Sequence, residues 1–296
     1  MRIAAAYPSA LTWSSMVMKS ILLVAERAAS IRQGVNRALM LARYLRLRLD
    51  ILLCDTALAT APRPEHTPPF AIEEARQYLE AIRSSVTASD VQIATHAVFE
   101  GPLHELVARH ARAESAALII KSSSHRCTAH DVRVDWHLSR DSPVPLLLTQ
   151  GTPWHPRARF AVAIDVMDQQ RRSHSRAVCN MLTSLQAACG AELDLLYAQP
   201  QREESSPQPQ LLQLARESAI ESQSMHVLRG EPSAVLPPYA AARGFDVIAV
   251  GVQRDKSFPA YVKSLPAELL RSLPVDVLFV KNEEPALFSA RPAAYA

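Results

Sequence analysis

A loop in the second half of the chain has the position and the charges of a phosphate-binding turn. The segment GVQRDKSFPAYVKSL (251–265) follows the apolar run FDVIAV and precedes PAELLRSL, so it joins a buried strand to a helix. In parallel α/β folds nucleotides dock at such turns, because the backbone N–H groups there are unpaired and a helix N-terminus points at the ligand. Phosphate binding is therefore the first chemistry to consider.

A second stretch, SHRCTAHDVRVDWH (124–137), carries residue types that ligate zinc. Its candidate ligands are His125, Cys127, His130 and His137. Their spacing matches no standard zinc pattern, so chance clustering in a polar loop is the favoured interpretation and no metal site is expected. His104 and His110, six positions apart in LHELVARHARAE, are expected on different faces of a helix as surface histidines.

The glycine content excludes several nucleotide-binding and nucleophile motifs. The 7 glycines are Gly34, Gly101, Gly151, Gly190, Gly230, Gly244 and Gly251. No G-x-G-x-x-G, G-x-x-x-x-G-K-[ST] or G-x-S-x-G can be built from these positions. Rossmann dinucleotide binding, a P-loop and the serine-hydrolase elbow therefore lack sequence support, and no catalytic residue is predicted.

Two copies of one α/β unit must position these residues. The first alternates apolar runs with helical patterns from ILLVAE (21–26) to PLLLTQG, and the second does so from RFAVAID (159–165) to VDVLFVK. Segments such as FEGPLHELV and LRGEPSAVL line up, which indicates an internal duplication. Consecutive parallel strands need right-handed helical crossovers. Each copy is thus predicted to be an open five-stranded parallel sheet with helices on both faces.

The stretch QGTPWHPRAR (150–159) is predicted to separate the copies. The predicted units are an N-terminal extension 1–18, domains 19–152 and 157–282, and a C-terminal tail 283–296. Trp136 and Trp154 are expected to pack at the end of the sheet or between the halves, as large aromatics usually do. Pro237 and Pro238 should kink or split the third helix of the second copy, since each removes a backbone donor.

The composition is that of a globular protein. With 296 residues, of which 48% are hydrophobic, the chain can fill a core. Its 32 Lys and Arg against 29 Asp and Glu give a net charge of +3 and no concentrated basic region, so no nucleic-acid partner is predicted. No apolar run approaches the roughly 20 residues of a membrane span. The 4 cysteines lack disulfide-framework density, which favours a reducing cytoplasmic location.

Residues 19–282 resemble the universal stress protein family in its tandem-domain form. The resemblance rests on Asp165 in VAIDV, on the VIAVG strand ending at Gly251, on DWHLSRDSPVPLLLTQGTPW (135–154) and on PAELLRSLPVDVLFVK. It implies an adenine nucleotide alpha hydrolase-like fold and a non-catalytic stress-response role. Single domains of this family pair through their last strands, so the two halves are expected to form an intramolecular pseudo-dimer. Protein partners and higher homo-oligomers are left open.

Some members of this family bind ATP through an acid after the first strand and a loop resembling G-x-x-G-x₉-G-[ST]. On this sequence Asp165 takes the place of the acid, and Gly251 that of the first glycine. Arg254 replaces the second glycine, Ser264 replaces the third, and Leu265 follows it. A Cβ at such a glycine costs about 1 to 2 kcal/mol, because the loop must reach φ > 0 and approach phosphate closely. The resemblance therefore implies at most weak adenine-nucleotide binding and no firmly held cofactor.

The first half matches the ATP-binding pattern less well. Glu26 replaces the strand-end aspartate, and Lys121 is taken to stand where Gly251 stands in the second half, so no nucleotide is expected there. In the second half, Arg254 is interpreted as a solvated loop charge and Ser264 as a helix N-cap. The open alternatives are an ATP-binding or ATP-hydrolysing stress protein and a carrier of an apolar or metal ligand.

Overall fold

The computed structural model describes most of both predicted halves. The described residues are 19–26, 31–54, 69–86, 90–99, 101–123, 129–167, 169–202, 205–221, 224–252, 265–272 and 275–281, without the side chains of 129–131 and 169–172. The predicted N-terminal extension and C-terminal tail lie outside these ranges.

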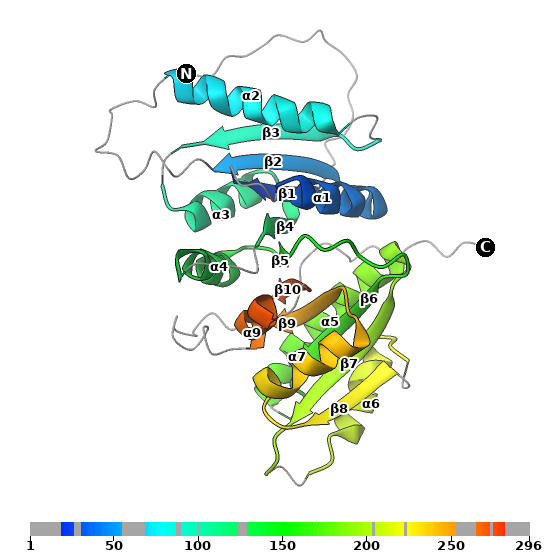
Figure 1. Ribbon diagram of the computed structural model, residues 1–296. Coiled ribbons are helices and arrows are strands. Elements are labelled where there is room, and N and C mark those ends of the chain that lie inside the picture. The colour runs from blue at the N-terminus through cyan, green and yellow to red at the C-terminus, as the bar shows by residue number, and fades with distance from the viewer. Residues whose placement is uncertain are drawn as a thin grey trace, which may run out of the picture.

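Each half follows the predicted βαβαβαβαβ order (Figure 1). The elements of the first half are β1 (Ser20–Ala25), α1 (Ile31–Leu45), β2 (Arg48–Cys54), α2 (Pro69–Ser85), β3 (Ile93–Val98), α3 (Leu103–Ala113), β4 (Ala116–Ser122), α4 (Ala129–Asp141) and β5 (Leu146–Thr149). Those of the second half are β6 (Arg159–Ile164), α5 (Gln169–Cys189), β7 (Glu192–Gln199), α6 (Gln208–Glu217), β8 (Met225–Arg229), α7 (Pro232–Arg243), β9 (Val247–Gly251), α9 (Leu265–Ser272) and β10 (Asp276–Val280).

The strands form one ten-stranded sheet in the order β3-β2-β1-β4-β5-β10-β9-β6-β7-β8. All neighbouring strands within a half are parallel, and the single antiparallel pair is β5 with β10. Leu147 pairs there with Leu278, and both are buried. The predicted fold, two five-stranded parallel sheets joined as an intramolecular pseudo-dimer through their last strands, is confirmed.

Helices cover both faces of the sheet (Figure 1). Successive side chains of a strand point to opposite faces, so Ile21 and Leu23 belong to the core under α1, α2, α5 and α6. Leu22 and Val24 belong to the core under α3, α4, α7 and α9. Strands buried on both sides are continuous apolar runs, as parallel sheets require, and both cores extend across the two halves.

A buried polar cluster connects the halves beside the β5–β10 junction. Asp276 of β10 accepts hydrogen bonds from the Gln150 backbone N–H at 2.8 Å and from Trp154 Nε1 at 2.9 Å. Its Oδ2 also lies 3.0 Å from Nε of Arg37 on α1. The guanidinium of Arg37 stacks 3.9 Å from the centre of the Trp154 ring. Trp154 therefore packs between the halves, as expected.

Of the two outcomes predicted for the third helix of the second half, a kink or a split at its prolines, the split is wrong. Pro237 and Pro238 lie inside α7, which continues to Arg243. Each proline removes one backbone donor, whereas Leu236, Pro237 and Ala240 are buried in the core, and that packing holds the helix together. Among the described residues, no helix is both long enough and apolar enough to cross a membrane.

Candidate functional site

The sheet register shows which residues of the two halves correspond. Ser20 pairs with Arg48 in the first half and Arg159 with Glu192 in the second, so Glu26 corresponds to Asp165, as expected. Leu22 pairs with Ile119, and its counterpart Ala161 pairs with Ile248. Three residues further along, Ser122 therefore corresponds to Gly251. The expected correspondence of Lys121 with Gly251 is wrong by one position, which reverses the face that the side chain points to.

The carboxyl edge of the second half brings two of the four predicted site residues together. Asp165 directly follows β6, Gly251 ends the adjacent strand β9, and the two strands pair at Ala163 and Val250. Ser175 Oγ donates a 3.0 Å hydrogen bond to the backbone oxygen of Asp165. Arg254 and Ser264, the other two predicted residues, lie outside the described residues.

The ring of His174, on α5, occupies the space next to Gly251. A Cβ added at Gly251 would lie 2.8 Å from His174 Nε2, closer than real side chains approach. The ring is buried, and Nε2 lies 2.9 Å from the Val280 carbonyl oxygen. Gly251 is not among the glycines with positive φ. The close approach of His174 therefore explains this glycine without a nucleotide.

The same edge of the first half contains a buried ion pair. Lys121 Nζ lies 3.2 Å from Asp135 Oδ1 and 3.6 Å from Glu26 Oε2. Ser123 Oγ donates to Asp135 Oδ2 at 3.1 Å, and both Lys121 and Asp135 are buried. Lys121 and Asp135 thus neutralise one another at the carboxyl edge, on the face of the sheet that α4 covers.

The two halves fill the space between the first helix and the strand end in opposite ways. In the first half a Cβ added at Gly34 of α1 would meet the Ser122 hydroxyl at 2.6 Å. In the second half the helix contributes His174 and the strand contributes Gly251. In each half, therefore, a glycine faces a larger residue across this space. His174 was missed because RRSHSR (171–176) reads as a solvated helix face, and only the packing of α5 on the sheet reveals its contact.

A cavity of about 380 Å³ lies between α1 and the connection that joins the halves. Its lining includes Gln33, Asn36, Arg37, Trp154, His155 and Cys189. Arg37 is already engaged there, because its Nη2 donates to the Thr152 carbonyl oxygen at 2.7 Å. The charged group of Arg37 therefore serves the junction between the halves.

The histidines of α3 are not simple surface residues, contrary to expectation. His104 stacks on His137 with ring centroids 4.4 Å apart, and both rings lie within 4.0 Å of Asp141. Arg140 Nε binds that carboxylate at 2.7 Å. Burial, His104 and Arg140 lower the pKa of His137. Of the zinc-ligand types noted earlier, His125, Cys127 and the His130 side chain lie outside the described residues.

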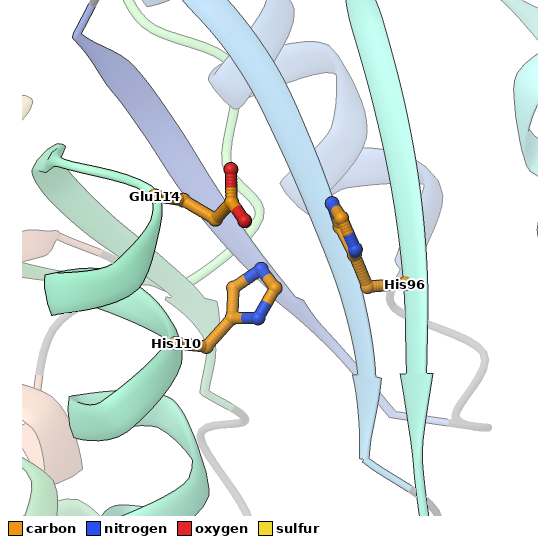
Figure 2. A group of neighbouring side chains, drawn as sticks. All are labelled: His96, His110 and Glu114. Carbon is orange, nitrogen blue, oxygen red and sulfur yellow. The ribbon is translucent and has the colours of Figure 1, made fainter. Parts of the chain in front are cut away.

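His110 belongs to a separate cluster with His96 of β3 and Glu114, which follows α3 (Figure 2). The ring centroids of His96 and His110 are 4.5 Å apart and the ring planes are inclined by 64°. Burial and His96 lower the pKa of His110. This cluster was not predicted, because His96 and His110 are brought together only when α3 packs on the sheet.

The fold is shared with proteins of known structure. No protein-family model and no curated protein sequence matches the chain. A functionally unknown protein from Pseudomonas aeruginosa PAO1 is 22% identical, with a TM-score of 0.66 over 89% of this chain and 92% of the other. A universal stress protein from Archaeoglobus fulgidus DSM 4304 is 14% identical, with a TM-score of 0.67 over 88% of this chain and 96% of the other. Both halves together thus have the fold of universal stress proteins.

Proposed function

We propose that the protein is a tandem member of the universal stress protein family, closest to universal stress protein E, and that it serves a bacterial stress response in the cytoplasm. The shared fold supports this proposal. So do the residues that carry the sequence resemblance, because Asp135 forms the buried pair with Lys121 and Trp154 binds Asp276 between the halves. The segment 135–154, on which the resemblance partly rests, thus contributes Asp135 to an ion pair within the first half and Trp154 to a contact between the halves.

The protein acts through its folded surface, without catalysis and with at most weak adenine-nucleotide binding in the second half. The contact of His174 with Gly251 is the observation that carries this part of the proposal. A phosphate cradle needs bare main chain with room beside it, whereas an imidazole fills the space beside this glycine. In the first half the Ser122 hydroxyl occupies the corresponding space beside Gly34.

A thermal-shift titration with ATP and Mg²⁺ tests the proposal. A ligand at 100 times its dissociation constant stabilises the folded state by about 2.7 kcal/mol, and at the dissociation constant by only about 0.4 kcal/mol. For a chain of this size the first corresponds to a rise in Tm of roughly 4 °C, and the second to less than about 1 °C. We expect a shift of about 1 °C or less at millimolar ATP. A rise of several degrees at micromolar ATP would overturn the proposal.

Phosphate release from ATP tests the non-catalytic part separately. We expect no turnover over hours with the purified full chain. Turnover that disappears in Asp165→Ala but persists in Glu26→Ala, the matched change in the first half, would establish the ATP-hydrolysing alternative instead. Both variants remove one carboxylate at equivalent positions, and far-UV circular dichroism shows whether each is folded.

A further inference from the structure

The cluster of His96, His110 and Glu114 lies away from the carboxyl edge discussed above. His96 projects from β3 toward α3, and His110 and Glu114 come from the last turn of α3 and the residue after it (Figure 2). Their ligand atoms all lie within 4.8 Å of one another. Two imidazoles and a carboxylate thus converge on one point between a helix end and the sheet.

One ring nitrogen of each histidine has no hydrogen-bond partner among the described residues. Nε2 of His96 and Nε2 of His110 are buried, and neither has a hydrogen-bond partner in the described part of the chain. An unsatisfied buried polar group lowers the stability of the fold by about 1 to 3 kcal/mol, so two of them on facing rings destabilise the metal-free protein. Neutral imidazoles present lone pairs that a cation can accept simultaneously.

The surrounding charges favour a cation. Asp50 of β2 is buried, and its Oδ1 also has no hydrogen-bond partner within the described ranges. Arg48 Nη2 binds Glu114 Oε2 at 2.6 Å and Asp50 Oδ2 at 3.1 Å. Two carboxylates facing one guanidinium leave one negative charge in excess beside the neutral rings. Arg48 also fixes the orientation of Glu114, as hydrogen-bonded neighbours do for carboxylates that ligate metals.

The second half provides an internal comparison at the same place in its fold. The register pairs Leu52 with His96 and its counterpart Leu196 with His226, so the two histidines correspond. His226 Nε2 lies 3.2 Å from Asp194 Oδ2. Arg243 Nη2 lies 3.4 Å from the same carboxylate oxygen and 3.2 Å from the His226 ring nitrogen. His226 of the second half thus has protein partners, and the cation beside its ring is the guanidinium of Arg243.

Two substitutions at the helix, together with Arg48 in place of Glu192 on the strand, distinguish the two environments. Aligning the starts of α3 and α7, and the positive-φ residues Ser115 and Gly244 after them, gives the corresponding residues. The pairs are Asp50 with Asp194, His96 with His226, His110 with Tyr239, and Glu114 with Arg243. The first half therefore has a second imidazole and a carboxylate where the second half has a phenol and a guanidinium.

We propose that His96, His110 and Glu114 bind a divalent transition metal of the zinc class, with Arg48 positioning Glu114. Two imidazoles and one carboxylate are a ligand set that zinc accepts, with a fourth position open to water or another ligand. Bonds of about 2.0 to 2.1 Å in a tetrahedral site place ligand atoms roughly 3.3 Å apart. The ligand atoms, now within 4.8 Å of one another, must therefore approach by at most about 1.5 Å when the metal binds.

Calorimetric titration of the full chain with zinc chloride, after removal of metals by a chelator, tests the proposal. We expect one zinc ion per chain, and His96→Gln and His110→Gln should each weaken its affinity about 100-fold or more. His226→Gln, the matched change in the second half, should leave the affinity within a factor of about two, because His226 is already partnered. Far-UV circular dichroism and the Tm in chelator show whether each variant is folded.

Two results would overturn the proposal. One is the absence of a heat of binding with micromolar zinc for the unmodified chain. The other is zinc binding that survives both His96→Gln and His110→Gln and is lost in a His125→Gln, Cys127→Ser double variant, which would place the metal in the segment 124–128. Neither result depends on nucleotide binding, so the proposed function is tested independently.

Discussion

The ion pair between Arg37 and Asp276 is expected to contribute strongly to the stability of the joined halves. Arg37 is 8% exposed and Asp276 is 1% exposed, and they come from opposite halves. Arg37→Ala leaves the carboxylate with the Gln150 N–H and the Trp154 indole but without its counter-charge. Removing one partner of a buried pair typically costs about 3 to 5 kcal/mol, because the remaining charge is buried and uncompensated.

Urea denaturation followed by far-UV circular dichroism measures this loss in the free energy of unfolding. Arg271→Ala is the control, because it breaks the ion pair with Glu268 on the surface of α9, where such pairs contribute about 0 to 1 kcal/mol. The double variant Arg37→Met, Asp276→Leu should recover only part of the loss, because it removes both charges but leaves the Gln150 N–H and the Trp154 indole without their acceptor. A loss for Arg37→Ala of less than about 1 kcal/mol, equal to the control, would refute the reasoning.

The same variant gives a pH dependence of defined sign. Burial raises the pKa of Asp276, and the Arg37 guanidinium opposes that rise. Without Arg37 the folded-state pKa lies further above that of the unfolded chain, so the folded protein binds the proton more tightly. Stability then falls as the pH rises through the folded-state pKa. The loss caused by Arg37→Ala should therefore be larger at about pH 8 than at about pH 5.

Two further predictions concern buried groups in the two halves. Burial raises the pKa of Cys54 and of Cys179 to about 12, so neither thiol of the native protein should react with iodoacetamide at about pH 8, whereas both should react in urea. Peptide mass spectrometry checks this, and labelling of native Cys54 or Cys179 at the rate seen in urea would contradict it. Gly251→Ala should destabilise the fold by about 1 to 3 kcal/mol through overpacking against His174, and Gly251→Ala combined with His174→Ala should restore stability in urea denaturation. A neutral Gly251→Ala variant would show that His174 does not constrain the glycine.

Most of the fold could be predicted because its signals are local. Strands buried on both faces are apolar runs such as VIAVG, and the helices between them repeat apolar residues at helical spacing. The pairing of β5 with β10 was predicted from the family resemblance, because neither strand has a sequence feature that specifies its partner. The helix α7 continues through Pro237 and Pro238 because it buries apolar side chains against the sheet. Helix propensity alone does not measure that burial.

The candidate site was less predictable, because its contacts join residues distant in sequence. Asp165 and Gly251 could be placed at one edge, since the ends of adjacent parallel strands meet there. The alternation of side chains in β4 puts Ser122, and not Lys121, at the place of Gly251, and that one-residue difference cannot be read from an apolar run. The contact of His174 with Gly251 joins residues from α5 and β9, so neither local sequence indicates it.

Comparing the two copies residue by residue offers a signal that neither copy contains alone. In the first half Gly34 of α1 faces Ser122 of β4, and in the second half His174 of α5 faces Gly251 of β9. The larger residue thus lies on the strand in one half and on the helix in the other, so the two differences compensate one another. The exchange of Arg243 for Glu114 is different, because it reverses a charge beside an equivalent histidine. In the first half the guanidinium belongs to Arg48, the counterpart of Glu192, and it binds Glu114, while Nε2 of His96 and of His110 has no hydrogen-bond partner in the described part of the chain. The duplicated chain thus directs the search for a ligand to the His96 cluster, since the second half shows what the same position contains when the protein satisfies it alone.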